Sequence, residues 1–564
     1  MTLRAFVVAL AIFFTTNAVA FLGTGMYALN GFGKPVSWWF ILKLPAHIHR
    51  SENASSERTP CKCSSPICGS TIDSVQDRSH GLCYLYADSE NPSLEYFETL
   101  GYDCLGQGGN DPLSHTLRQM NTSLSFRDRF WAYFSDQYDR LSTVFPGAAC
   151  EQSSRFSAHA KGAVAFDAKS GGFYLQTSTP NYPDPSDLHS FTPLGCQKDN
   201  NVLYSQHLMA VSLDQDGIDS LGKALQAARL CSANYYDTRN EDLKERIVSS
   251  SFRQAYQDPT NEFYENARMM GGALLDPALE SISQSREAVL KLKQPEAYKS
   301  TQDLDGSAVY QYLPGGEILV LPDFAKGAFP GGNWSVQLIV KSPKAEIPPW
   351  AIVAQVLEED LSVATWWDES VGIPTICASD QYSMTPFEFC LNDRVHGVFL
   401  NANGTAAHNI ENLVEAKWTT DSTKNDTVHW HLVGGRQEDG NHAKWGVTTS
   451  RFGVVAPDSK VIFADLNMEG YPCSTTCHGS QAGRGGSFFI LSQPVLHQSL
   501  VNLVSKACQC SAVAESYSEN ATAVFEEARM CHRGCVKKIT QRLTSTSLPK
   551  LSSEARSFWN ERHQ

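Results

Sequence analysis

The hydrophobic positions of this 564-residue chain fall into short runs separated by polar and glycine-rich segments. Runs rich in aromatic and β-branched residues, bounded by turn residues, predict strands. One such pattern, "KGAVAFDAKSGGFYLQTSTP", predicts a β-hairpin that turns at Gly171 and Gly172. The other predicted strands lie within residues 36–45, 81–88, 130–136, 203–213, 335–340, 350–357, 461–470 and 483–491.

Helical spacing, with apolar residues three and four apart, occurs mainly in the middle and at the end of the chain. It predicts helices within 217–230 and 279–293, and a helical region from about residue 495 onward. Disulfides would hold that last region as a small helical hairpin, and the cysteines placed to form them are Cys508, Cys510, Cys531 and Cys535.

The first residues, "MTLRAFVVALAIFFTTNAVAFLG", have the pattern of a secretory signal peptide cleaved after Ala20, because ten apolar residues are too few to span a bilayer. We therefore expect a soluble protein that is lysosomal, lumenal or extracellular. Sixteen cysteines fit an oxidising compartment, where disulfides are favoured over the alternative of metal sites. Six candidate glycosylation sites agree with this route: Asn53, Asn121, Asn333, Asn403, Asn425 and Asn520.

The formal net charge of −14 argues against a nucleic-acid partner at neutral pH, because binding to phosphates is mainly electrostatic. Protonation of all 16 histidines would bring the charge from −14 to +2. A polyanion partner is therefore expected only in an acidic compartment. An acidic surface that binds no partner is the simpler alternative on charge alone.

Two segments share the sequence His-Ala-Lys: His159 to Lys161, and His442 to Lys444, which lies 283 positions further on. Average residue usage gives roughly 0.05 exact copies by chance. Each copy precedes an apolar run and a glycine-rich turn, which indicates a weak internal duplication and two related α/β halves.

Two histidines that meet where such halves join could carry out phosphoryl transfer without a metal or other cofactor. One would attack phosphorus to form a phosphohistidine, and the other would protonate the leaving oxygen. In an extended segment the lysine two positions later points to the same side as the histidine, so it would stabilise the nonbridging oxygens. The alternative is that both histidines are ordinary and both lysines solvated. The sequence has no G-x-S-x-G, Walker or H-E-x-x-H pattern that would favour other chemistry.

Several of these segments follow one another in an order that resembles the deoxyribonuclease II family. They are "PVSWWFILKLP", "YFSDQ", "HAKGAVAFDAKSGGFYL", "STPNYP", "SQHLMAVSL", "VGIPTICASD", "NHAKWGV", "ADLN" and "RGGS". The resemblance spans about residues 33 to 490, weakens over about 235 to 345, and does not reach the last 70 residues.

This resemblance implies an α/β, phospholipase-D-like fold of two pseudo-symmetric halves, with mixed β-sheets flanked by helices. The helical pattern from about residue 495 onward adds a helical C-terminal extension to this fold. The expected division is 1–20 signal peptide, 21–230 first half, 231–345 helical insert, 346–494 second half and 495–564 extension. The resemblance also implies a metal-independent endonuclease, favoured at acid pH, that cleaves DNA to a 3′-phosphate and a 5′-hydroxyl. His159, Lys161, His442 and Lys444 would be catalytic, and Asp465 and Asn467 of "ADLN" would support them.

Three residues depart from the family pattern. Thr177 stands where the family has a further functional histidine, and a hydroxyl cannot carry the charge of an imidazolium. Gly446 stands where the family usually has a cysteine, so one disulfide would be missing or rewired. Ala160 and Ala443 replace a threonine or serine within the motifs. The alternatives to an active nuclease are a weak or inactive relative that binds nucleic acid, and an enzyme that acts on RNA or a lipid.

Overall fold

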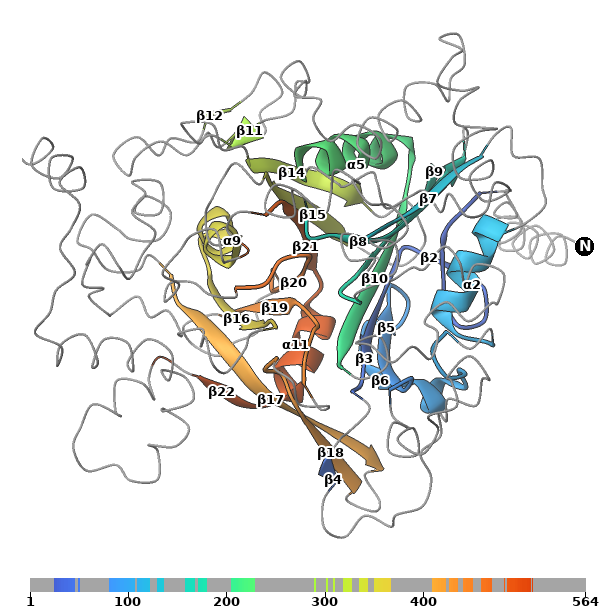
Figure 1. Cartoon of the computed structure of the whole chain (residues 1–564), viewed down its shortest axis with the longest axis vertical. Coiled ribbons are helices and arrows are strands. Elements are labelled where there is room, and N and C mark those ends of the chain that lie inside the picture. The colour runs from blue at the N-terminus through green and yellow to red at the C-terminus, as the bar shows by residue number, and fades with distance from the viewer. Residues whose placement is uncertain are drawn as a thin grey trace, which may run out of the picture.

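The computed structural model describes the parts of the chain that form its two large sheets and the helices beside them (Figure 1). These residues are 25–45, 49–50, 81–106, 109–121, 129–135, 158–167, 171–179, 204–228, 289–290, 301–302, 308–309, 318–326, 334–342, 349–366, 408–421, 426–434, 440–449, 458–468, 481, 484–508 and 510.

The first large sheet has seven antiparallel strands, all from the first 213 residues. In spatial order they are β6 (Glu95–Tyr96), β5 (Tyr84–Asp88), β3 (Trp38–Lys43), β10 (Gln206–Leu213), β9 (Gly171–Thr177), β8 (Lys161–Asp167) and β7 (Arg129–Ser135). The strands predicted at 36–45, 81–88, 130–136 and 203–213 are therefore confirmed, as is the hairpin of β8 and β9. Gly171 has a φ of 90°, a left-handed conformation that glycine adopts at little cost.

The second large sheet is mixed, because β16 and β17 run parallel while its other pairs are antiparallel. Its order is β11 (Val289–Leu290), β14 (Ile318–Lys326), β15 (Ser335–Lys341), β21 (Gly486–Ser492), β20 (Lys460–Ala464), β19 (Trp445–Thr449), β16 (Asp360–Ala364), β17 (Ile410–Asp421), β18 (Asp426–His431) and β4 (His49–Arg50), with β22 (Val504–Cys508) also on β17. Two small sheets pair β1 (Ala28–Leu29) with β2 (Pro35–Val36), and β12 (Thr301–Gln302) with β13 (Ala308–Val309).

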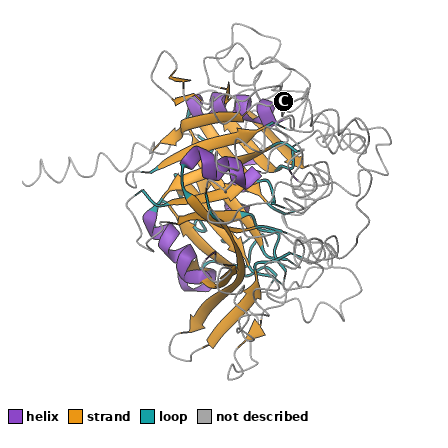
Figure 2. Ribbon diagram, turned by 90° about the vertical axis from the view of Figure 1, so that its left-hand side faces the viewer, coloured by secondary structure: helices purple, strands orange, loops and turns teal. Residues whose placement is uncertain are grey.

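Helices are few among the described residues, and Figure 2 shows them lying against the strands. They are the α-helices α2 (Pro112–Arg118), α5 (Gln215–Ala228), α9 (Pro349–Leu357) and α11 (Pro494–Leu503), and the short 3-10 turns η3 (Phe97–Leu100) and η4 (Gln119–Asn121). The helix predicted within 217–230 is confirmed as part of α5.

The two sheets repeat one arrangement. The order β3-β10-β9-β8-β7 in the first sheet corresponds to β15-β21-β20-β19-β16 in the second. A helix follows the third strand of each antiparallel meander, α5 after β10 and α11 after β21. Since one His-Ala-Lys precedes β8 and the other precedes β19, the sequence repeat belongs to a structural repeat. The prediction of an α/β fold with two related halves is confirmed.

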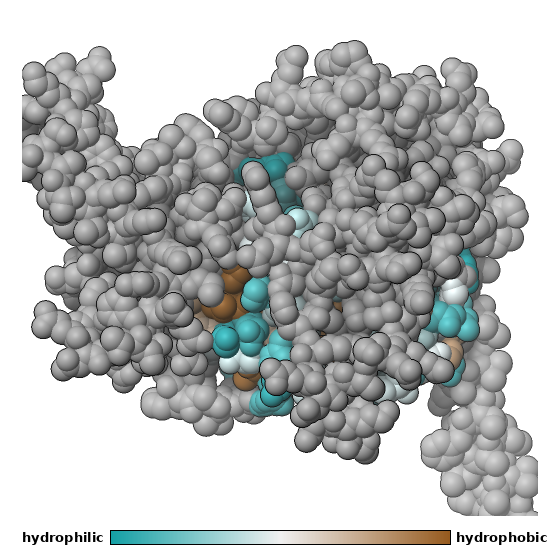
Figure 3. All heavy atoms as spheres, turned by 60° about the horizontal axis from the view of Figure 1, so that its bottom comes forward, coloured by the Kyte–Doolittle hydropathy of each residue, from teal (hydrophilic) through white to brown (hydrophobic). Residues whose placement is uncertain are grey.

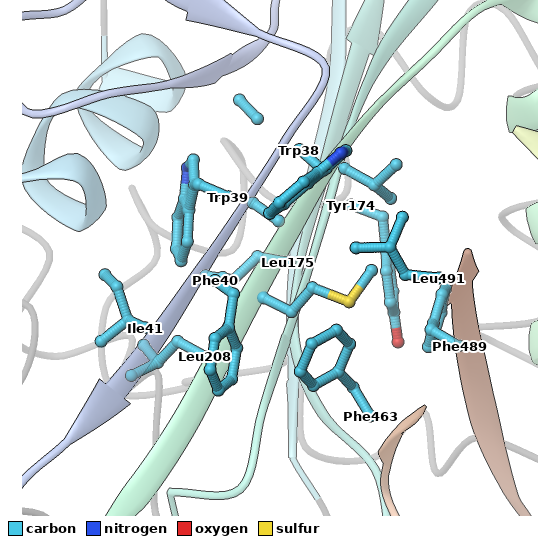
Figure 4. Close-up of a cluster of buried hydrophobic side chains, with 14 of the residues drawn as sticks. Trp38, Trp39, Phe40, Ile41, Tyr174, Leu175, Leu208, Phe463, Phe489 and Leu491 are labelled. Atoms are coloured by element: carbon cyan, nitrogen blue, oxygen red, sulfur yellow. The ribbon is translucent and has the colours of Figure 1, made fainter. Parts of the chain in front are cut away.

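The core lies where the two sheets face each other (Figure 4). Phe40 of β3 packs on Phe463 of β20, with ring centroids 4.6 Å apart, and Tyr174 of β9 stacks on Phe489 of β21 at 5.2 Å. On the opposite face of β3, Trp39 donates its indole N–H to Thr116 of α2. Burial on both faces explains why β3 reads as an unbroken apolar run rather than an alternating one.

The strand predicted at 350–357 is wrong, because this segment forms helix α9. A buried apolar run cannot be assigned to strand or helix by periodicity alone. Pro349 occupies the first turn of the helix, where its missing N–H costs nothing. Trp350 and its neighbours then pack as a second core cluster against the outer face of the second sheet.

The region after residue 494 begins as the predicted helix, α11, but continues as strand β22, which pairs with β17. The described parts of 231–345 also form strands, two of which, β14 and β15, lie inside the second sheet. Of the helix predicted at 279–293, only 289–290 is described, and it forms the short strand β11. The rest of that helix, the proposed signal peptide, and Cys531 and Cys535 lie outside the described residues.

The surface described by the structure shows small groups of hydrophilic and hydrophobic residues (Figure 3). Among the described residues, the large hydrophobic side chains that remain exposed are Phe32, Val495 and Val501. No helix in the described ranges is long and apolar enough to cross a membrane. Of the six candidate glycosylation asparagines, Asn121 lies in η4 with its side chain undescribed, and Asn53, Asn333, Asn403, Asn425 and Asn520 lie outside the described residues.

Asp111 caps helix α2 by accepting a hydrogen bond from the backbone N–H of Ser114, and its second oxygen is buried without a partner among the described residues. Burial raises the pKa of this carboxyl from 3.8 to about 6. Because the pKa of this carboxyl is higher in the folded than in the unfolded protein, the protonated carboxyl makes its full contribution to stability below the unfolded pKa. This contribution is lost as the pH rises toward 6.

We therefore expect Asp111→Asn, which keeps the cap but removes the charge, to raise the free energy of unfolding at neutral pH. The expected gain is on the order of 2 kcal/mol at about pH 7.5, and it should shrink toward pH 4. Denaturant unfolding at both pH values measures it. Equal stability of the two proteins at neutral pH would contradict this account.

Candidate active site

The first His-Ala-Lys segment runs into β8, which begins at Lys161, and reaches across to the second half. The backbone N–H of His159 donates to the carbonyl of Gly485, next to β21, at 2.8 Å. The His159 ring lies with Nδ1 2.7 Å from the backbone carbonyl of Asp465, and the ammonium of Lys161 lies 3.4 Å from Nε2. Both side chains are buried.

These contacts fix the tautomer of His159. A carbonyl oxygen can only accept, so Nδ1 must carry the proton, and the neutral ring then has its lone pair on Nε2. This is the nitrogen that faces Lys161.

The second His-Ala-Lys segment lies directly before β19 and makes the reciprocal contact. The backbone N–H of His442 donates to the carbonyl of Ser205, next to β10, at 2.8 Å. Lys444 is buried, its ammonium donates to the His442 carbonyl at 3.0 Å, and its backbone N–H donates to Nδ1 of His207 at 3.0 Å. Ser205 and Gly485 therefore hold equivalent places in the two halves.

The two segments converge at the end of strand β20. Ala464, its last residue, donates its backbone N–H to the carbonyl of Lys444, and the next residue, Asp465, accepts from His159. The charges of Lys161 and Lys444 both act on Asp465 and on His442. The two His-x-Lys pairs, which are 283 residues apart in sequence, thus lie around the same site at the end of β20.

Asp465 is held by two donors: the side-chain amide of Gln176 at 3.0 Å and the backbone N–H of Ser487 at 2.8 Å. Burial raises the pKa of its carboxyl to about 7, although these hydrogen bonds and the charges of Lys161 and Lys444 act in the opposite direction. Asn467 is buried nearby in sequence, and its side-chain oxygen has no partner among the described residues.

The His442 ring lies between aromatic neighbours. Tyr204 stacks on it with centroids 4.4 Å apart and planes 13° apart, and Trp366 meets it edge-on at 5.9 Å. Part of the side chain remains accessible. The surrounding atoms nevertheless desolvate the ring and lower its pKa well below the ordinary value, and the charges of Lys444, Lys161 and Lys43 lower it further.

Sequence reasoning did not identify several residues of this location, among them Gln176, Tyr204, His207 and Trp366. The polar pair Gln206-His207 at the start of the otherwise apolar β10 was the available signal, because polar side chains buried in a sheet require a partner. Tyr204 and Trp366 carried no signal, since aromatic residues beside strands are common.

Two of the positions that depart from the family pattern are packed closely against their neighbours. Thr177 is buried, and its hydroxyl is bonded to that of Thr179 at 2.9 Å and to the carbonyl of His207 at 3.2 Å. Gly446 of β19 faces the Trp350 ring of α9, and a Cβ there would lie 2.8 Å from it. A larger residue at position 446 would therefore require Trp350 to move.

The cysteine predictions are tested only at the described positions. Cys104, Cys508 and Cys510 are disulfide-bonded, while Cys83 is a buried thiol. In the described ranges, no group of three or more His, Cys, Asp or Glu side chains is arranged to hold a metal ion.

Comparisons with known proteins support the resemblance found in the sequence. Residues 70–274 match the family described as Deoxyribonuclease II, a range that contains the first His-Ala-Lys but not the second. Deoxyribonuclease-2-alpha of Rattus norvegicus is 28% identical over 196 residues, 34% of this chain and 43% of the relative. The Mus musculus protein of the same name is 25% identical over 225 residues, 40% and 49% of the two chains.

A third relative, Plancitoxin-1 of Acanthaster planci, is 24% identical over 218 residues, 39% of this chain and 48% of the relative. The chain thus spans less than half the length of each of these curated relatives. The resemblance to the deoxyribonuclease II family is confirmed.

Proposed function

Because this chain carries a deoxyribonuclease II domain over residues 70–274, we propose that it is a hydrolase that cleaves DNA. The proposed reaction is metal-independent endonucleolytic cleavage at acid pH, leaving 3′-phosphate and 5′-hydroxyl ends. Its main support is the convergence of two His-x-Lys pairs, one from each half, beside the end of β20. The second pair lies outside the range that matches the family. Its role in the proposal is therefore supported by the structural repeat and not by the family match.

We assign the nucleophile to His159. Its Nδ1–H donates to the Asp465 carbonyl, so the lone pair on Nε2, which faces the ammonium of Lys161, is the one that would attack phosphorus. In the first step the bond from Nε2 to phosphorus forms and the bond from phosphorus to the 5′ oxygen breaks. In the second step water attacks phosphorus, the bond from nitrogen to phosphorus breaks, and the 3′-phosphate is released.

His442 is then the general acid. In the first step it gives its proton to the departing 5′ oxygen, and in the second it takes a proton from the attacking water. Since desolvation and three lysine charges lower its pKa, the ring carries the required proton only in acid solution. A bound phosphodiester would offset those lysine charges and raise the pKa again.

The two lysines stabilise charge on the nonbridging oxygens. Asp465 competes for them when ionised, but with a pKa of about 7 it is neutral in an acidic compartment. Its protonation leaves the charges of Lys161 and Lys444 to attract a phosphate. Acid pH thus favours both the protonated general acid and the cationic binding site.

The setting that fits this chemistry is the lysosome or the extracellular space. The proposed leader at residues 1–20, the candidate glycosylation sites and the disulfide-bonded Cys104, Cys508 and Cys510 agree with passage through the secretory route.

Thr177 supports the second candidate, a weak or inactive relative that binds nucleic acid. Its hydroxyl is occupied by Thr179 and by a backbone carbonyl, so it supplies no charge to a phosphate. The two candidates differ in whether DNA is cut.

The test is nicking of supercoiled plasmid DNA by the purified full chain, with chelator present, across a pH series. We expect nicking at about pH 5 and at least ten-fold less at about pH 7.5, because the general acid loses its proton. End analysis should find 3′-phosphates. Binding of the plasmid without nicking at any pH would favour the second candidate.

A further inference from the structure

We propose that His207 is a positioning residue for this site, holding the second His-Ala-Lys segment through Lys444. This inference rests on the proposed function, because the reaction it would support is the cleavage assigned to His159 and His442. His207 lies on β10, in the opposite half from the segment that it contacts, and 237 positions from it. It belongs to neither His-Ala-Lys segment.

The contact is specific in its chemistry. The backbone N–H of Lys444 can only donate, so Nδ1 of His207 must accept with its lone pair, and the ring must be neutral. The ring is fully buried, and it lies over Phe463 with planes 23° apart. Its backbone is fixed separately, because its N–H donates to the Ser178 hydroxyl at 2.9 Å.

The structural repeat shows why this position matters. His207 on β10 and Ser487 on β21 hold equivalent places, each two residues after the carbonyl that binds a motif histidine. The backbone N–H of Ser487 holds the carboxylate of Asp465, whose carbonyl in turn binds His159. In each half, the residue at this strand position therefore supports the His-Ala-Lys segment of the other half. In the first half the supporting group is the His207 ring, and in the second half it is the backbone N–H of Ser487.

The position of Lys444 contributes to the position of His442, together with the hydrogen bond from the His442 N–H to Ser205. Lys444 is two residues from His442, and its ammonium also donates to the His442 carbonyl. Loss of the His207 acceptor would leave a buried backbone N–H unpaired and allow the segment to shift. Small displacements of a general acid reduce the rate of the chemical step more than they reduce substrate binding.

The experiment compares two isosteric variants. Asparagine can place its side-chain oxygen where Nδ1 lies, whereas glutamine places its polar atoms one bond further out. We expect His207→Gln to lower kcat for plasmid nicking by about 10- to 100-fold with KM changed less than about three-fold. His207→Asn should retain most of the wild-type kcat, and thermal unfolding should show that both variants fold.

A second readout does not depend on DNA cleavage. Hydrogen exchange of the full chain, followed in peptides that contain Lys444, should be faster in His207→Gln than in wild type, and close to wild type in His207→Asn. Wild-type protein that does not cut DNA would overturn the nuclease proposal, and this exchange pattern would still support the positioning contact.

Two outcomes would overturn the role of His207. If both variants keep the wild-type kcat, the contact does not position the acid. If His207→Asn is as impaired as His207→Gln although Lys444 exchanges slowly in it, the imidazole is needed for a reason other than this acceptor.

Discussion

Replacing His442 by alanine should abolish nicking of ordinary DNA at every pH, because no other group would protonate the leaving 5′ oxygen. General acid catalysis contributes about 100- to 10,000-fold, so the rate should fall by at least about 100-fold. Initial rates of plasmid nicking in the presence of chelator measure this loss. His429→Ala is the matched control, since His429 lies on β18 in the same sheet and pairs with Glu415 instead.

A substrate with sulfur in place of the bridging 5′ oxygen distinguishes the two histidines. A thiolate leaves without protonation, so this substrate should restore the first step, strand cutting in a single turnover, to His442→Ala but not to His159→Ala. Rescue of His159→Ala alone would reverse the assignment of nucleophile and acid. Wild-type activity in either variant on ordinary DNA would place the active site elsewhere.

Replacing Lys444 by methionine should lower the maximal rate by about 100- to 1000-fold, the usual cost of removing one donor that stabilises transition-state charge. It should also move the pH profile. The charge of Lys444 is the largest electrostatic cause of the lowered pKa of His442, so removing it raises that pKa. The high-pH limb of the rate profile should therefore shift toward neutral pH.

Rate profiles of Lys444→Met and wild type across a pH series measure both effects. Lys417→Met is the control, because Lys417 is exposed on β17 of the same sheet. If the rate falls but the high-pH limb of the rate profile does not move, the titrating group is not His442. An unchanged rate would remove Lys444 from the proposed site.

The sequence predicted the strands that are buried on both faces or end in a glycine turn. The β8–β9 hairpin and the apolar runs of β3 and β10 are examples, because their residue types and turn signals agree at short range. The same reasoning failed for α9, where a run of buried apolar residues satisfies helix and strand equally well. Strand β22 was also missed, since its pattern is partly exposed and its partner β17 lies far away in sequence.

What the sequence determined about the candidate site was the identity of its chemical groups. The repeated His-Ala-Lys named His159, Lys161, His442 and Lys444, because extended segments put His and Lys on one side. The resemblance to the deoxyribonuclease II family added Asp465 and Asn467 of "ADLN". Which of these residues lie close to one another in the fold was decided only by the tertiary structure. The contact of His159 with Asp465 joins residues 306 apart, and that of His207 with Lys444 joins residues 237 apart. Such contacts fix tautomers and lower or raise pKa values through burial and neighbouring charge, and both depend on how two sheets pack rather than on local pattern.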